Sequence, residues 1–291
     1  METERLRRVK AIALILVAAG AIWADGPAYD QAHKLYNSTD FQQSIKVLLA
    51  IPSKDAAVYA LLGRNYYMEG DFKKASEALE QSFQLDPTNA EYALWLGRAF
   101  GRRAETASPF TAPGYAARTR QYLEKAVALN PANLEAQSDL FEYYLEAPGF
   151  LGGGMEKAEA VAQQVGGISP PEGLAMEAKL AERRKEYSSA EEQLRRALDV
   201  APLQAGRFLD LARFLVRRGR LDEADQVLAR AGKASPNNLK LMYATAEIYV
   251  KAHHNLDVAK ELLKRYLSAT ITPEDPPKSE AAKLLRQVQG G

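Results

Sequence analysis

The chain repeats itself at a period close to 34 residues, and this constrains its fold more than any single motif does. Nine positions between Tyr59 and Pro87 recur 149 residues later, each with a residue of similar size. The matched positions are Tyr59 and Phe208, Leu62 and Leu211, Gly63 and Ala212, Tyr66 and Leu215, Gly70 and Gly219, Ala75 and Ala224, Leu79 and Leu228, Ser82 and Ala231, and Pro87 and Pro236. The same frame continues after 34 residues at Ala93, Leu96, Gly97 and Phe100. Such a period predicts an array of similar units, each stacked on its neighbours.

Each unit is predicted to be a hairpin of two helices. Apolar residues fall at helical spacing over 59–66 and again over 75–82, and the turn sequence "EGD" lies between the two runs. Because Gly63 and Ala75 are small, we expect the two helices to approach closely there. Pro87 lacks an N–H and discourages continuation of the second helix. The predicted fold class is therefore all-α.

The segment "VYALLGRNYYMEGDFKKASEALEQSFQLDP" resembles the tetratricopeptide repeat, with its aromatic residue, Leu-Gly pair, Tyr, central Ala and closing Pro. The unit that ends at Pro236 resembles it too, and the other units are degenerate. The resemblance implies an α-solenoid, a right-handed superhelix of about seven hairpins over residues 25–273, followed by a capping helix and tail over 274–291. It also implies a protein that binds a protein or peptide partner in its concave groove, without catalysis.

The groove is expected to be lined by residues of the first helices that hairpin packing does not use. Counted from the Leu-Gly pair, the candidates are Arg64, Tyr67, Arg98, Arg102, Lys179, Arg183, Arg213 and Arg217. Planar Arg groups bind carboxylates bidentately, which favours an acidic peptide as partner. The alternative is a solvated face of mixed charge, because Glu142, Glu146, Glu172 and Glu182 interrupt the basic residues. The family's carboxylate clamp uses Asn and Lys where Arg64 and Arg98 stand, so it is not carried over.

Two insertions break the period between the helices of a hairpin. Pro87 to Pro131 spans 44 residues, with the excess around "AETASPFTAPGYAA", and Pro131 to Pro170 spans 39, with the excess around "EAPGFLGGGMEK". Consecutive turns lie along one edge of a solenoid, so we expect the two insertions to be neighbours. Their apolar residues either form an exposed patch for a partner or pack onto their own helices. These residues are Phe110, Tyr115, Phe150 and Leu151.

Composition and motifs give no indication of catalysis. The chain has 38 Lys and Arg against 37 Asp and Glu, and this balance argues against nucleic-acid binding by bulk charge. Cysteine is absent, the three histidines lack a metal-ligand pattern, and no nucleophile elbow occurs. The glycines of "GFLGGGMEK" do not form a phosphate loop, because Met155 and Glu156 stand where such a loop needs Lys and a hydroxyl. We therefore expect a protein that is not an enzyme and has no cofactor or metal.

The N-terminal segment predicts export. Four basic residues precede "AIALILVAAGAIWA", fourteen residues without a charge that end at Ala24. This run is shorter than the roughly 20 residues of a membrane-spanning helix, as is typical of a signal peptide. An uncleaved membrane anchor formed by residues 1–24 is the alternative, and the array would still lie outside the cytoplasm. We expect a periplasmic or otherwise exported scaffold in the envelope of a bacterium. The remaining alternatives are a membrane-anchored subunit of a larger complex and a solute-binding accessory protein.

Overall fold

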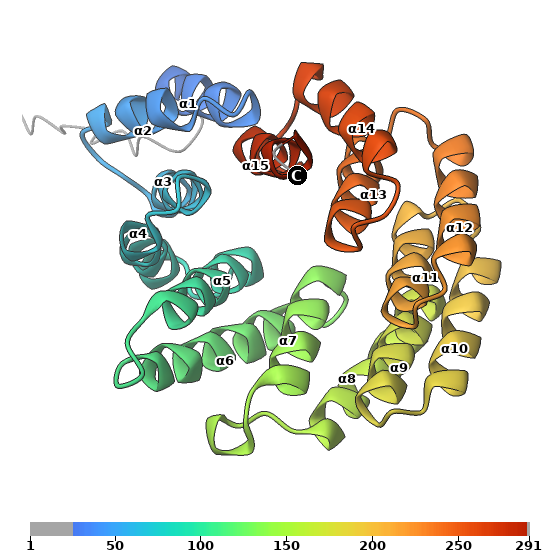
Figure 1. Cartoon of the computed structure of the whole chain (residues 1–291). Helices are drawn as coiled ribbons and strands as arrows, with labels where there is room; N and C mark the ends of the chain where they lie inside the picture. Colours follow the sequence, from blue (N-terminus) through green and yellow to red (C-terminus); the bar gives the residue numbers. More distant parts are fainter. Residues whose placement is uncertain (1–25, 290–291) are drawn as a thin grey trace, which may run out of the picture.

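The computed structural model describes residues 26–289, which form helices and no strand (Figure 1). The predicted signal or anchor segment, residues 1–24, lies outside the described residues. The helices are α1 (Pro27–Asn37), α2 (Phe41–Ala50), α3 (Ala56–Met68), α4 (Phe72–Leu85), α5 (Ala90–Thr106), α6 (Ala112–Leu129), α7 (Leu134–Glu146), the 3₁₀ turn η1 (Gly149–Leu151), α8 (Met155–Ile168), α9 (Pro170–Arg183), α10 (Tyr187–Val200), α11 (Ala205–Arg217), α12 (Leu221–Ala234), α13 (Leu239–Lys251), α14 (Leu256–Ser268) and α15 (Lys278–Gln289). Within 26–289 no helix is both long enough and apolar enough to cross a bilayer.

Consecutive helices pair into hairpins, from α1 with α2 to α13 with α14, and α15 packs against the last pair. The first helices of the hairpins, α3, α5, α7, α9, α11 and α13, line the inner side of a curved array, as Figure 1 shows. The second helices, such as α4, α6, α10 and α12, lie outside them. The all-α solenoid expected from the period is confirmed by this arrangement.

Small residues set the distance between paired helices. A Cβ atom added to Gly63 would lie 2.5 Å from Cγ of Leu79, and one added to Gly97 would lie 2.9 Å from Cδ2 of Leu123. Either distance is too short for a side chain, so the close approach expected at Gly63 is confirmed. The turn between α3 and α4 also depends on particular residues. Gly70 has a φ of 79°, in the left-handed region, and the side chain of Asp71 caps α4 by accepting a hydrogen bond from the N–H of Lys74.

The first insertion was expected between two helices, and the structure corrects this. The helix α5 has 17 residues and α6 has 18, against 13 for α3 and 14 for α4, so each helix is longer by four residues. Because 3.6 residues complete one turn, each helix gains about one turn and keeps its inward face. In the second insertion the extra residues do lie between the helices, over 147–154, where η1 forms.

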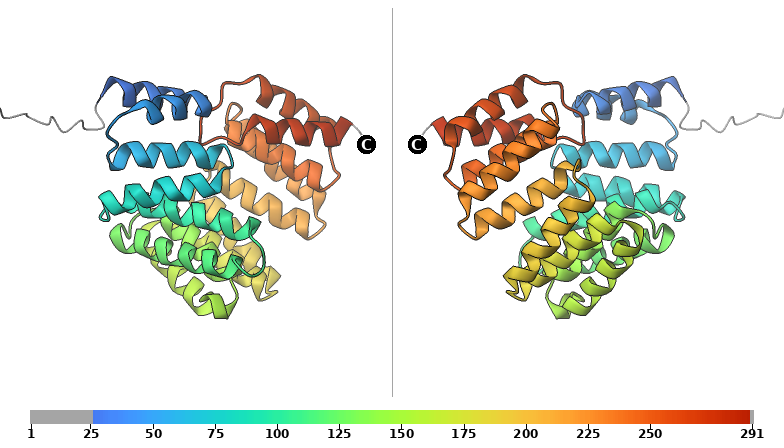
Figure 2. Two further views of the ribbon diagram at one scale, coloured as in Figure 1. Left: turned by 90° about the vertical axis from the view of Figure 1, so that its left-hand side faces the viewer. Right: turned by 90° about the vertical axis from the view of Figure 1, so that its right-hand side faces the viewer.

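The two ends of the array meet. Residues 269–277 leave α14 as a strap, in which Asp275 accepts hydrogen bonds from the backbone N–H and the hydroxyl of Thr272, both at 2.9 Å. A space of about 190 Å³ separates this strap from the first two hairpins. Its lining comes from Thr39, Phe41, Met68, Ile271, Thr272, Asp275, Pro277 and Lys278. Figure 2 shows the N-terminal helices beside the C-terminal helices, and in Figure 1 α15 lies between the first and the last hairpin.

Candidate functional site

Ion pairs cross every junction between first helices from α3 to α13. Each pair joins a basic residue on one helix to a carboxylate on the next or the preceding first helix. The pairs are Arg64 with Glu91 at 2.8 Å, Arg98 with Asp139 at 2.5 Å and Glu135 at 3.1 Å, Lys179 with Glu142, Arg183 with Glu146 at 3.3 Å, Arg207 with Glu172 at 3.0 Å, Arg217 with Glu182 at 2.6 Å, and Arg213 with Glu247 at 4.0 Å. We call this set the ion-pair ladder. It favours the mixed-charge alternative over a stripe of free cations.

Aromatic residues hold the basic side chains at the start of the ladder. The guanidinium groups of Arg64 and Arg98 lie 5.0 and 5.3 Å from the ring centre of Trp95. Tyr67 packs edge-on against the same ring, with 5.4 Å between ring centres. Arg102 pairs with Glu105 on its own helix and lies over the ring of Phe72. These predicted groove residues therefore form one aromatic and basic cluster on α3 and α5.

The pair between Arg98 and Asp139 is the most enclosed contact of this cluster. Burial raises the pKa of the Asp139 carboxyl, although its hydrogen bond from Arg98 opposes that shift. Burial also disfavours the charged form of Arg98, but its bonds to Asp139 and Glu135 outweigh burial and raise the pKa of the guanidinium. The carboxylate of Asp139 thus lies where an additional positive charge is favourable.

A cavity of about 500 Å³ lies beside this pair, between α5, α6, α7 and η1. Its lining combines small and apolar residues with charged ones. The lining comprises Tyr67, Gly97, Arg98, Gly101, Arg102, Ala104, Glu105, Ala116, Thr119, Leu123, Asp139, Glu142, Tyr143, Glu146, Ala147, Pro148 and Leu151. The cavity therefore brings together Tyr67, Arg98 and Arg102 from the predicted groove and Leu151 from the predicted loop set.

Both insertions contribute to the walls of this cavity. Ala104 and Glu105 belong to the added turn of α5, while Pro148 and Leu151 belong to the segment after α7. The hydroxyl of Tyr143 donates a hydrogen bond of 2.9 Å to the carbonyl of Leu151 and fixes η1 against α7. Consecutive insertions were expected to be neighbours, and here they share one cavity.

The glycines after η1 shape a tight turn. Gly152 has a φ of 86°, in the left-handed region, and a Cβ on Gly153 would lie 1.9 Å from the carbonyl oxygen of Ala147. The ammonium group of Lys157 donates to the carbonyl of Gly152 at 2.9 Å. The backbone at the start of α8 is therefore part of a closed turn, which agrees with the expectation that this stretch is not a phosphate loop.

The four apolar residues of the insertions divide into two pairs. Phe110 and Phe150 are 95% and 82% exposed. Tyr115 stacks on Phe100 with 6.2 Å between ring centres and accepts a hydrogen bond from Arg103 at 2.5 Å. Leu151 lines the cavity. Internal packing therefore describes Tyr115 and Leu151, whereas Phe110 and Phe150 are individually exposed; a patch that binds a partner stays a prediction.

Sequence reasoning named Glu142 and Glu146 as interruptions of the groove, but it missed Glu135 and Asp139 and paired none of the four with a basic residue. Glu135, Asp139, Glu142 and Glu146 follow one another at spacings of four, three and four residues and so share one face of α7. This face meets Arg98 on one side and Lys179 and Arg183 on the other. The spacing was a usable signal, together with the period that places α7 between the basic residues of α5 and α9.

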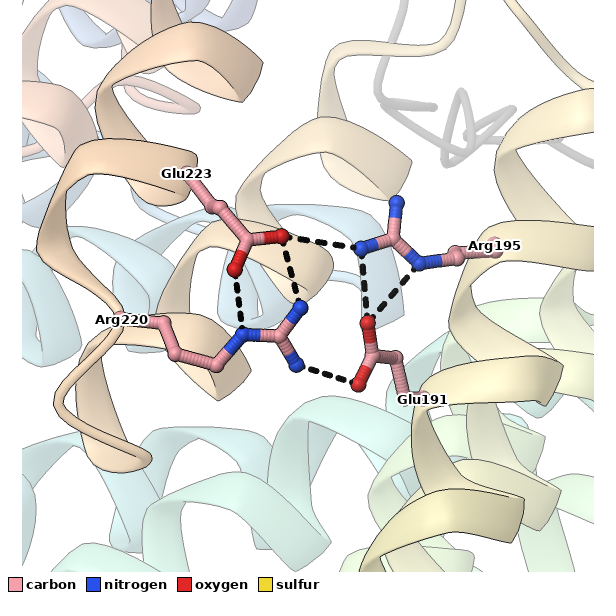
Figure 3. A network of polar contacts seen from close by, with 4 residues as sticks. All are labelled: Glu191, Arg195, Arg220 and Glu223. Carbon is pink, nitrogen blue, oxygen red and sulfur yellow. Dashed lines mark hydrogen bonds and ion pairs between the residues drawn. The ribbon is translucent and has the colours of Figure 1, made fainter.

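A second polar network lies on the outer side and was also missed. Figure 3 shows Glu191 and Arg195 of α10 facing Arg220 and Glu223 at the start of α12. Arg220 donates to Glu223 at 2.6 Å and to Glu191 at 2.5 Å, and these bonds lower the pKa of both carboxyls. The network links two hairpins from outside, so it provides a comparison surface for experiments on the groove.

The stacked hairpins and their curved inner face define an α-solenoid. Two segments, residues 56–89 and 181–244, match models of the tetratricopeptide repeat. These matches and the arrangement of the hairpins support the tetratricopeptide repeat family, whose members mediate contacts between proteins.

Solved structures show the same fold at low sequence identity. A tetratricopeptide repeat protein from Parabacteroides merdae is 14% identical, with a TM-score of 0.56, over 90% of this chain and 97% of that one. A chain of the Cut9–Hcn1 hetero-tetramer of APC/C is 15% identical, with a TM-score of 0.50, over 88% of this chain and 48% of that one. No curated protein matches the sequence.

Proposed function

We propose that the protein is a non-enzymatic scaffold of the cell envelope that binds a protein or peptide partner through its concave face and the inserted segments. The cavity between α5, α6, α7 and η1 carries the proposal, because groove residues and an inserted residue line it together. Most of its lining comes from α3, α5 and α7, the helices of the inner face, which supports a protein partner over an enclosed solute.

The ladder is compatible with binding. Its pairs between Lys179 and Glu142, Arg183 and Glu146, and Arg217 and Glu182 include side chains that are about half exposed. Exposed pairs contribute only about 0–1 kcal/mol each, so a partner exchanges them at small cost. The same residues then offer both signs of charge, which gives specificity and orientation more than affinity.

Affinity purification of the full chain tests the concave face. The groove variant is Lys179→Ala/Arg183→Ala/Arg217→Ala. The matched outer variant is Arg184→Ala/Arg195→Ala/Arg220→Ala, in which Arg184 is the ion-pair partner of Glu159 on α8. Both remove three paired cations, and circular dichroism checks folding. We expect the groove variant to change recovery of the partner and the outer variant to leave it unchanged. Equal recovery of the partner by both variants would contradict binding through this face.

Location has its own test. We propose export on the charge and apolar pattern of residues 1–24. Sequencing of the mature N-terminus from membrane and soluble fractions separates two outcomes. Cleavage after Ala21 or Ala24 supports an exported scaffold, whereas an intact N-terminus in membranes supports the anchored subunit of a complex.

A further inference from the structure

We infer that the cavity between α5, α6, α7 and η1 takes a bulky apolar side chain of the partner, with a basic residue directly beside it. The inference rests on the proposed function and deepens it. It differs from the sequence-based expectation of an acidic peptide, which becomes an outcome of the test.

The shape of the cavity carries the first half of the inference. Gly97, Gly101 and Ala104 of α5 and Ala116 of α6 are small residues of the lining and leave space between the larger side chains. Tyr67 and Tyr143 supply aromatic walls, and Leu123 and Leu151 add apolar surface. A volume of about 500 Å³ accommodates a large side chain. Aromatic residues bury about 150–250 Å² each and dominate the energetics of interfaces, so an aromatic anchor fits best.

The cavity is a property of this pair of hairpins. Without its added turn, α5 would end before Ala104 and Glu105, and without η1 the end of α7 would leave the space open. A Cβ on Gly101 would lie 3.6 Å from Cγ2 of Thr119, at ordinary contact distance. Packing of α5 on α6 therefore does not require glycine at 101, and the bare position keeps the cavity open.

The charges of the lining support the second part of the inference, a basic residue of the partner beside the apolar side chain. The lining has four carboxylates, Glu105, Asp139, Glu142 and Glu146, against the two guanidinium groups of Arg98 and Arg102. Lys179 and Arg183 neutralise Glu142 and Glu146 from α9, but these side chains are 41–63% exposed. A basic residue of the partner replaces them at small cost, whereas an acidic residue meets repulsion from α7.

Fluorescence anisotropy with three labelled peptides of equal length tests the inference on the full chain. Each peptide has a central Trp, flanked by two Lys, two Ser or two Glu. We expect the Lys peptide to bind at least fivefold more tightly than the Glu peptide, with the Ser peptide between them. Replacement of the Trp by Ala is expected to weaken binding at least tenfold. Tighter binding of the Glu peptide, or no measurable binding of any peptide, overturns the inference.

Two variants fill the cavity from different positions, Gly101→Leu and Ala104→Phe. Each is expected to weaken binding of the Lys peptide at least tenfold. The matched control is Gly114→Leu on α6, where an added Cβ meets nothing within 4 Å. The double variant Glu142→Gln/Glu146→Gln is expected to reduce the preference for Lys over Glu below twofold. Unchanged binding by a folded Gly101→Leu or Ala104→Phe variant contradicts the inference.

The outcome also separates this inference from the proposed function. If the cavity variants still recover the partner in affinity purification while the groove variant changes its recovery, the inference falls and the proposed function stands. If none of these variants changes recovery, both fall.

Discussion

Two neighbouring hairpins each contain extra residues, yet they accommodate them in different ways. In the hairpin of α5 and α6, most of the ten added residues lengthen the helices, and the connection is only 107–111. In the hairpin of α7 and α8, the helices keep 13 and 14 residues and the connection 147–154 holds the five additional residues. The local sequence explains the difference. "RRAET" continues a helix and Pro113 starts the next, whereas Pro148 and four glycines stop helix formation.

The difference shows that the number of added residues does not decide their structure. An added turn in each of two packed helices brings its own contacts: Arg103 donates to Ser76 at 2.8 Å and lies 4.2 Å from the ring centre of Tyr115. The glycine-rich connection has few such contacts, but its Leu151 is held in place by Tyr143. One insertion thus extends the core, and the other supplies a wall to a cavity.

The largest effect is expected where the lengthened helices pack. Gly97→Leu places a side chain where Leu123 lies at 2.9 Å, and such overpacking costs about 3 kcal/mol. The free energy of unfolding from urea titration should fall accordingly. As control, Gly114→Ala on the same hairpin should raise that free energy by about 0.5 kcal/mol, because alanine favours a helix and no atom is in the way. A loss below 1 kcal/mol for Gly97→Leu would show that the two helices can move apart.

The connection 147–154 should be sensitive at one glycine. Gly153→Ala places a Cβ 1.9 Å from the carbonyl oxygen of Ala147, so the turn must shift, at a cost of about 2 kcal/mol. Gly149→Ala is the matched control, because nothing lies within 4 Å of its added Cβ. Hydrogen exchange should show faster exchange around η1 in the first variant alone. Equal exchange in both variants would mean that this turn does not need glycine at 153.

The contacts of the added turn should have a moderate effect. Arg103→Ala removes hydrogen bonds to Ser76 and to the Tyr115 hydroxyl, and we expect a loss of about 1 kcal/mol in the free energy of unfolding. Arg102→Ala removes an exposed pair on the same turn and should cost less than about 0.5 kcal/mol. If both variants lost equal stability, the added turn would owe its order to helix propensity rather than to Arg103.

The smallest effect is expected in the unfolding free energy at alkaline pH. It concerns Tyr144 of α7, whose hydrogen bond to Glu124 of α6 joins the two hairpins. Burial and the hydrogen bond to Glu124 raise the pKa of Tyr144. A tyrosine whose pKa is raised by folding stabilises the protein below its ordinary pKa of 10.0, and this contribution is lost as pH rises toward the folded value. Tyr144→Phe should cost about 0.5 kcal/mol at pH 7. It should also reduce the fall in unfolding free energy between pH 10 and 11, measured by urea titration. An unchanged fall would contradict the assignment to Tyr144.

The architecture could be predicted from the sequence because the period and the small residues are local signals. The close approach at Gly63 depends on Leu79, only 16 residues away, and the hairpin turn depends on Gly70 and Asp71. The lengthening of α5 and α6 was missed because the length of a gap between prolines does not reveal whether the extra residues are helical. Their helical character was present in "RRAET", which contains no glycine or proline.

The groove was harder to predict, since its chemistry depends on residues about one repeat apart. Arg98 contacts Asp139 and Lys179 contacts Glu142, at separations of 41 and 37 residues. The inward face of a single helix does not show which charges it will meet, whereas in the assembled array each basic residue lies against a carboxylate of a neighbouring first helix. The cavity also could not be foreseen, because it depends on where α7 ends relative to the longer α5.

The strap 269–277 lies next to the first two hairpins, and this gives the first unit of the array a neighbour that it would otherwise lack. Terminal units of a stacked array ordinarily have one neighbour each, but here the first hairpin has a second one at the other end of the chain. Within residues 26–289 no hydrogen bond or ion pair joins these two ends, and residues of both line one small space. In the view of Figure 1 the array surrounds its concave face. A partner segment bound there would leave either along the axis of this view or through a parting of the two ends, and in the second case its dissociation would depend on residues that never touch it.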